Sequence, residues 1–271
     1  MRVSYHCHSK WSDGEGTIAD FVGAAGILGL DEFGISDHYV LTPNREKLWW
    51  SMAPDALDDY AADLQAASGD ALDGLTVRLG VEADFIPETV GDLQEVLRSQ
   101  PFDYVIGSVH IVNGFPIDNS PADWEPLATS ERDEIIRTYW IRIREMAESR
   151  LFDFAGHLDL TKKFGIYPSI DPTTEIEKAL DAIAASDMAV ELNTSGWTYT
   201  AREEYPSSTI LRGCLERGIP VVVSADAHKP ANLIRGFDDA YSLLKEIGFT
   251  EQASFAGRQR FMSPLPENVN I

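Results

Sequence analysis

Seven short apolar, β-prone runs alternate along this 271-residue chain with segments of helical periodicity. The β-prone runs are 2–5, 33–36, 75–81, 102–108, 152–155, 188–192 and 219–224. The helical segments are 18–28, preceded by Thr17 as a plausible N-cap, 54–67, 88–98, 131–149, 173–186, 207–217 and 238–247. Because strands that alternate with helices pair in parallel through right-handed crossovers, the pattern predicts an α/β fold.

The chain shows no sign of a division into domains. No linker rich in Pro, Gly or Ser interrupts it, so residues 1–271 are expected to form a single domain. The run 219–223 is nearly all apolar, as expected of a strand covered on both faces. A barrel of seven strand–helix units fits this length better than two domains, and an open doubly wound sheet is the alternative.

All six histidines lie at or just past the carboxyl end of a predicted strand, and none is left for the remaining surface. They are His6, His8, His38, His110, His157 and His228. Two acidic residues, Glu82 and Asp226, occupy equivalent places. In a parallel barrel the carboxyl ends of the strands converge on one face, so residues far apart in sequence become neighbours there.

Two pairs of these residues have alternate spacing, His6-x-His8 and Asp226-x-His228. Alternate residues of a strand share a face, so both members of each pair can reach one cluster while Cys7 points away. A single histidine is usually structural, but six in equivalent positions predict a metal site at the carboxyl ends of the strands. Imidazoles with carboxylates suit Zn, Fe or Mn.

The charge and the cysteine content limit the partners and the cellular compartment that are expected for this protein. With 22 basic against 44 acidic residues, the net charge of −22 disfavours binding to nucleic acid or to an anionic membrane. Two cysteines make no disulfide scaffold, which is typical of a reducing compartment. The start of the chain does not resemble a signal peptide, and the longest uncharged apolar run, 21–30, is too short to span a bilayer. A cytoplasmic protein is therefore expected.

An ordered set of motifs over nearly the whole chain resembles the PHP (polymerase and histidinol phosphatase) superfamily. The motifs are His6-Cys7-His8-Ser9, Asp13-Gly14, Ser36-Asp37-His38, Gly80-Val81-Glu82, Gly107-Ser108-Val109-His110, Gly156-His157-Leu158-Asp159-Leu160 and Ser224-Ala225-Asp226-Ala227-His228. Each piece alone is weak, but the ordered set is strong. The resemblance implies a distorted (β/α)7 barrel that holds two to three divalent transition metals.

The resemblance also implies which residues hold each ion. The three sets are His6, His8, Glu82 and Asp226; Asp13, His38 and His228; and Glu82, His110 and His157. Glu82 would therefore bridge two ions. Asp13 stands where some members use histidine, and its harder, anionic oxygen slightly favours Fe or Mn over Zn.

Segments 82–87, 107–110, 114–118, 156–164 and 191–196 resemble the histidinol-phosphate phosphatase branch of this superfamily. That branch implies release of phosphate from L-histidinol phosphate, in histidine biosynthesis. Close relatives often carry a basic residue just after the turn that corresponds to 193–196. Here Trp197, Thr198 and Tyr199 follow the turn, and the first basic residue is Arg202.

The expected chemistry is attack on phosphorus by a hydroxide that bridges two metals, with the metals neutralising the developing charge. Catalytic roles are predicted for Glu82, Asp226 and His228. Asp226 or a metal-bound water would protonate the leaving alkoxide. Contacts to a small phosphorylated substrate are predicted for Lys162, Lys163, Asn193, Ser195 and Arg202.

Several neighbouring residues have two interpretations. Asp37 and Asp159 would either orient ligand imidazoles or cap helices. Trp49, Trp50 and Trp197 are candidates for the wall of the substrate pocket.

Two other functions stay open at this point. One is a PHP-type phosphoesterase or nuclease that acts on another phosphomonoester or on short oligonucleotides, although such an enzyme would be expected to carry basic stripes. The other is a non-catalytic metal-binding module, which would be expected to lack some of the nine ligand residues.

Overall fold

The computed structural model describes residues 1–267. One parallel sheet runs in the order β1-β2-β4-β5-β8-β9-β10, and β3 pairs with β4 as an additional strand. The strands are β1 (Val3–Ser4), β2 (Glu32–Ile35), β3 (His38–Tyr39), β4 (Thr76–Asp84), β5 (Tyr104–Ser108), β8 (Phe154–Ala155), β9 (Ala189–Asn193) and β10 (Val221–Ser224). Each of the seven predicted strands is confirmed.

The first and last strands of this sheet meet just beyond their carboxyl ends. Cys7 and Ala227 form a parallel bridge there. The backbone N–H of His8 donates to the carbonyl of Ala227 (3.0 Å), and the N–H of Ala227 donates to the carbonyl of His6 (3.2 Å). These bonds bring the two edges of the sheet together. The architecture is thus a nearly closed seven-stranded barrel, and the alternative of an open doubly wound sheet is excluded.

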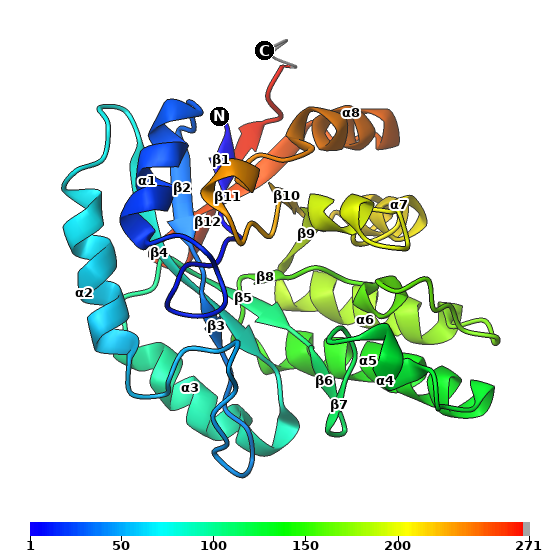
Figure 1. Cartoon of the computed structure of the whole chain (residues 1–271). Helices are drawn as coiled ribbons and strands as arrows, with labels where there is room; N and C mark the ends of the chain where they lie inside the picture. The colour runs from blue at the N-terminus through cyan, green and yellow to red at the C-terminus, as the bar shows by residue number, and fades with distance from the viewer. Residues whose placement is uncertain (268–271) are drawn as a thin grey trace.

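Helices cover the outside of the barrel, with α1–α3 on one side of the strands and α4–α8 on the other (Figure 1). They are α1 (Ile18–Ile27), α2 (Leu57–Ser68), α3 (Val90–Ser99), α4 (Pro121–Trp124), α5 (Thr129–Ser149), α6 (Thr173–Ser186), α7 (Ser208–Glu216) and α8 (Phe237–Ile247). The seven predicted helices are confirmed. Thr17 caps α1 in a capping box with Asp20, as its position before an apolar repeat indicates. No helix within residues 1–267 is long and apolar enough to span a membrane.

The elements that the sequence pattern did not predict are short or lie at the periphery. They are α4, β3, the hairpin strands β6 (Ile111–Val112) and β7 (Phe115–Pro116), the hairpin strands β11 (Glu251–Ala256) and β12 (Gln259–Pro264), and the 3-10 turns η1 (Pro87–Thr89), η2 (Leu160–Lys162), η3 (Thr194–Thr198) and η4 (Pro230–Asn232). Most of them span too few residues for a period of 2 or 3.6 to be recognised.

Aromatic side chains fill the amino-terminal part of the barrel. Tyr5, Tyr104 and Phe154 pack there with Phe255, which the β11–β12 hairpin contributes. The hydroxyl of Tyr104 donates to the carbonyls of Tyr5 (2.6 Å) and Ile35 (3.0 Å). Because this apolar packing fills the amino-terminal half of the barrel, the polar side chains lie at the carboxyl ends of the strands.

Two glycines make room for the Tyr104 ring. A Cβ atom on Gly80 would lie 2.1 Å from Cζ of Tyr104, and one on Gly34 would lie 2.3 Å from its hydroxyl oxygen. We expect Gly80→Ala to lower the free energy of unfolding by about 1–3 kcal/mol, because the packed ring cannot move aside freely. Urea denaturation measures this.

Gly23→Ala is the matched control for this substitution. Gly23 lies in α1, and its added Cβ would meet nothing within 4 Å. This change is expected to be neutral or stabilising by up to about 1 kcal/mol, because alanine favours helix. Equal effects of the two substitutions would contradict the packing argument.

Candidate metal centre

All nine predicted ligand residues meet at the carboxyl ends of the barrel strands. Their donor atoms form four overlapping groups, within each of which the atoms lie no more than 4.8 Å apart. The groups are His8, Asp13, His38 and His228; His6, Glu82 and His157; His6, His8 and Asp226; and His38, Glu82 and His110. The structure thus brings together residues that span positions 6 to 228, and their assignment to individual ions stays a prediction.

Glu82 lies at the centre of this cluster, fully buried on β4. Its two oxygens face different sets of imidazoles. Oε2 lies 3.2 Å from His6 Nε2, 3.5 Å from His8 Nε2 and 2.7 Å from His38 Nδ1. Oε1 lies 2.8 Å from His157 Nε2 and 3.6 Å from His110 Nε2. One carboxylate therefore faces both sets of imidazoles. A ligand that bridges two metal ions needs this geometry.

The other two carboxylates occupy one side of the cluster. Asp226 Oδ1 lies 3.1 Å from His8 Nε2 and 3.6 Å from His228 Nδ1. Asp13 Oδ1 lies 3.3 Å from His228 Nε2 and 3.9 Å from His38 Nε2. His228 therefore stands between two acidic oxygens, and the loop that carries Asp13 reaches the cluster.

Several buried atoms of the cluster make no hydrogen bond of normal geometry, although a charged or imidazole atom lies near some of them. They are His6 Nε2, both ring nitrogens of His8, Asp13 Oδ1, His38 Nδ1 and Glu82 Oε2. Burying such atoms unpaired costs free energy. Burial, together with the charges of His38 and His228, lowers the pKa of His8 to about 3, so its ring is neutral. A neutral imidazole with unpaired nitrogens among carboxylates is a suitable ligand for a divalent transition metal.

The electrostatics of the cluster also favour bound cations. Burial alone raises the pKa of Glu82 and Asp226, but the neighbouring histidines outweigh it and hold both pKa values well below the usual range. Burial opposes charge on His110, yet Asp84 and Glu82 raise its pKa to about 10. Likewise Asp13 and Asp226 raise the pKa of His228 to about 9 against burial. These carboxylates require positive charge, which protons or metal ions can supply.

Two further carboxylates orient imidazoles of the cluster. Nδ1 of His6 donates to Glu191 (2.8 Å), and Nδ1 of His110 donates to Asp84 (2.6 Å). Because a carboxylate only accepts, each bond leaves Nε2 free to face the cluster. The sequence reasoning missed both residues. For Asp84 the signal was present, since it follows Glu82 at the same alternate spacing as the two pairs that were recognised.

The residues expected in this orienting role act elsewhere. Asp37 accepts hydrogen bonds from the backbone and hydroxyl groups of Ser9 and Ser12, so it holds the loop that follows β1. Asp159 pairs with Lys162 (2.9 Å). Within residues 1–267 neither carboxylate hydrogen-bonds to an imidazole of the cluster, and Asp159 occupies the N-cap position of the 3-10 turn η2.

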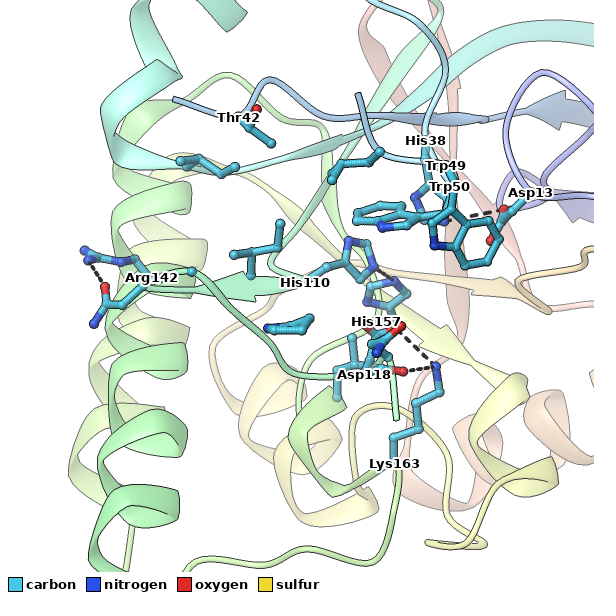
Figure 2. Close-up of a pocket in the computed structure, with 18 of the residues that line it drawn as sticks. Asp13, His38, Thr42, Trp49, Trp50, His110, Asp118, Arg142, His157 and Lys163 are labelled. Atoms are coloured by element: carbon cyan, nitrogen blue, oxygen red, sulfur yellow. Dashed lines mark hydrogen bonds and ion pairs between the residues drawn. The ribbon is translucent and has the colours of Figure 1, made fainter. Parts of the chain in front are cut away.

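A cavity of about 810 Å³ opens over the cluster (Figure 2). Asp13, His38, His110, His157, Asp226 and His228 line it. The ring of Trp50 stands edge-on to His38, with the centroids 5.0 Å apart, and Trp49 also lines the cavity. Trp197 is not among the lining residues, so two of the three predicted wall tryptophans reach this place.

Lys163 and Ser195 are the two predicted substrate residues that line the cavity. The ammonium of Lys163 donates to Oδ2 (3.0 Å) and to the carbonyl (2.9 Å) of Asp118, and Figure 2 shows it pointing toward the histidines. It also lies 4.7 Å from the centroid of the Tyr199 ring. A cation thus stands at the cavity wall, although no basic residue directly follows the 193–196 turn.

The other three predicted substrate residues do not line the cavity. Lys162 is 1% exposed, and its ammonium pairs with Asp159 and Glu203. Arg202 is exposed and donates to the carbonyl of Trp197 (3.2 Å). Asn193 is fully buried. Direct contact between these residues and a substrate in the cavity has no support from the geometry.

Comparison with known proteins agrees with the fold. The model of the PHP domain family matches residues 4–195. A Deinococcus radiodurans protein named probable histidinol-phosphatase is 38% identical over 86% of this chain and 88% of its own length. A Lactococcus lactis histidinol-phosphatase is 24% identical, with 94% of this chain and 95% of the relative covered.

A solved structure has the same overall architecture. It is the Lactococcus lactis histidinol phosphate phosphatase in complex with zinc, L-histidinol and phosphate. It superposes with a TM-score of 0.81 at 23% identity and covers 96% of this chain and 98% of its own. The family match spans more than half of the sequence and includes seven of the nine clustered residues, so this chain belongs to the PHP domain family.

Proposed function

We propose that this chain is a single-domain, metal-dependent phosphomonoesterase that hydrolyses L-histidinol phosphate to L-histidinol and phosphate in histidine biosynthesis. The observation that carries the proposal is the cluster of nine candidate metal ligands beside a cavity that also presents a lysine. The relatives named as histidinol-phosphatases support the choice of substrate.

The cluster is proposed to hold two to three divalent transition metals, Zn, Fe or Mn. The donors are imidazole nitrogens and carboxylate oxygens, and they fit these ions. When bound, the ions supply an acidified water and neutralise charge on the phosphoryl group. Glu82, Asp226 and His228 are proposed as catalytic residues, because Asp226 and His228 line the cavity and Glu82 lies buried at the centre of the cluster beside it.

Lys163 is proposed to bind a phosphate oxygen. An ammonium has three donors, and Asp118 accepts two of them, so one remains for the substrate. Although burial opposes its charge, Asp118 raises the pKa of Lys163, so the group stays cationic at neutral pH. Trp50, which also lines the cavity, offers a surface on which the substrate imidazole can pack.

The substrate assignment makes a kinetic prediction. We expect kcat/KM for histidinol phosphate to exceed that for p-nitrophenyl phosphate by at least roughly tenfold, equivalent to about 1.4 kcal/mol. The reason is that binding of the imidazole and ammonium groups assists the reacting centre, despite the better leaving group of the nitrophenyl ester. Initial rates of phosphate release measure the ratio, with a dinucleotide as a third substrate.

Two other outcomes of this assay would contradict different parts of the proposal. Faster turnover of the nitrophenyl ester or of the dinucleotide would overturn the histidinol assignment and leave a metal-dependent phosphoesterase. No turnover of any of the three substrates by metal-loaded protein would favour the non-catalytic module.

A further inference from the structure

We infer that Glu191 and Asn193 form a positioning relay that holds His6 in its metal-binding orientation and connects it to Ser195 at the cavity wall. The inference rests on the proposed metal centre, and it assigns to Asn193 a role other than substrate contact. Both residues lie on β9, which carries none of the nine clustered side chains.

The relay is a continuous series of buried hydrogen bonds. Nδ1 of His6 donates to Oε1 of Glu191 (2.8 Å), and Nδ2 of Asn193 donates to Oε2 of the same carboxylate (3.0 Å). The backbone N–H of Ser195 then donates to Oδ1 of Asn193 (2.8 Å). His6, Glu191 and Asn193 have no exposed surface, and Ser195 lines the cavity.

Position 193 requires an amide side chain. Its two partners are a carboxylate, which only accepts, and a backbone N–H, which only donates. An aspartate would set a second negative charge against Glu191, and an alanine would leave both partners unpaired. The backbone of Asn193 is held as well, because its N–H donates to the carbonyl of Tyr205 (2.7 Å) and its carbonyl accepts from the N–H of Tyr205 (3.1 Å).

The charge of Glu191 connects the relay to the metal centre. Within residues 1–267 its carboxylate accepts from His6 and Asn193 and makes no ion pair with a lysine or arginine. Its negative charge is therefore balanced through the His6 ring, on whose opposite side Nε2 faces Glu82 at 3.2 Å. A carboxylate behind a ligand imidazole fixes the ring and raises its basicity as a ligand.

Zinc affinity tests the relay without depending on turnover. Apo-protein and a chromophoric chelator compete for Zn²⁺ in wild type, Glu191→Gln, Asn193→Ala and the double variant. Glu191→Gln is expected to weaken the tightest zinc site by 10- to 100-fold, the usual effect of losing a carboxylate behind a metal ligand. Asn193→Ala should weaken it by less, roughly tenfold or below, and the double variant should match Glu191→Gln because both changes interrupt one series.

Steady-state kinetics distinguish the role of Glu191 from that of Asn193. With saturating Zn²⁺, Glu191→Gln should recover most of its kcat for histidinol phosphate, whereas Asn193→Ala should keep a raised KM because Ser195 has lost its acceptor.

Asp133→Asn is the matched control. This buried carboxylate accepts two hydrogen bonds from Ser169, outside the cluster, so its loss should lower stability without changing zinc affinity.

Zinc affinities within twofold of wild type for folded Glu191→Gln and Asn193→Ala would overturn the relay. Additive effects in the double variant would also overturn it. If the variants lose zinc affinity as expected but wild type fails to hydrolyse histidinol phosphate, the relay stands and the proposed substrate falls.

Discussion

Glu82→Gln is expected to lower kcat/KM for histidinol phosphate by at least roughly a thousandfold, about 4 kcal/mol. The Glu82 side chain faces five imidazoles, three through Oε2 and two through Oε1. Glutamine has nearly the same shape, but it removes the negative charge and replaces one acceptor with a donor. The change would therefore weaken both halves of the cluster at once.

His157→Gln is the comparison for this substitution. The His157 ring contacts Glu82 Oε1 at 2.8 Å and belongs to one candidate group, so its loss should reduce activity less and leave the other ions bound. Steady-state kinetics with elemental analysis of each variant measure both effects. Equal losses of activity with unchanged metal content would refute the bridging role of Glu82.

Removal of the metals is the second change with a large expected effect. The isolated protein should contain two to three ions per chain, and exhaustive chelation should reduce phosphatase activity by more than about a thousandfold, since metal-assisted stabilisation of the transition state is worth several kcal/mol. The thermal midpoint should fall as well. Each ion present at a thousand times its dissociation constant stabilises the folded state by about 4 kcal/mol, equivalent to a shift of roughly 10 °C in the midpoint of a chain of this size.

Activity assays and thermal denaturation before and after metal restoration measure these effects. Zn²⁺, Mn²⁺ and Fe²⁺ are added back separately, and the ion that restores both activity and midpoint identifies the preferred metal. Mg²⁺ is the control, because it prefers all-oxygen sites and should restore neither. Full activity with less than one ion per chain by elemental analysis would refute the proposed centre.

Much of the fold could be predicted because each element carries its own periodic signal. The strand 219–224 is apolar on both faces, and α1 starts at the Thr17 cap before an apolar repeat. The convergence of the candidate ligand residues could be predicted for a related reason. Parallel strands bring their carboxyl ends together, so a histidine after each of several strands implies a common site before any distance is known.

The residues around the cluster could not be predicted, because their roles depend on contacts that no local sequence pattern contains. Glu191 orients His6 from 185 positions away, and Asp37 holds the Ser9–Ser12 turn instead of an imidazole. A carboxylate next to a ligand in sequence need not be next to it in space, because side chains of successive residues on a strand or turn point in different directions.

The sequence alone determined the alternation of strands and helices and the residues that follow the carboxyl ends of the strands, since periodicity and strand ends are local properties. Closure of the sheet into a barrel was decided by the tertiary structure, through the bridge between Cys7 and Ala227. The tertiary structure alone decided which of two adjacent lysines faces the cavity. Lys162 and Lys163 are adjacent in sequence, yet Lys162 is buried with Asp159 and Glu203 while Lys163 reaches the cavity wall beside Asp118. The physical reason is that they lie at the end of the 3-10 turn η2, where each residue rotates the side chain by about a third of a turn.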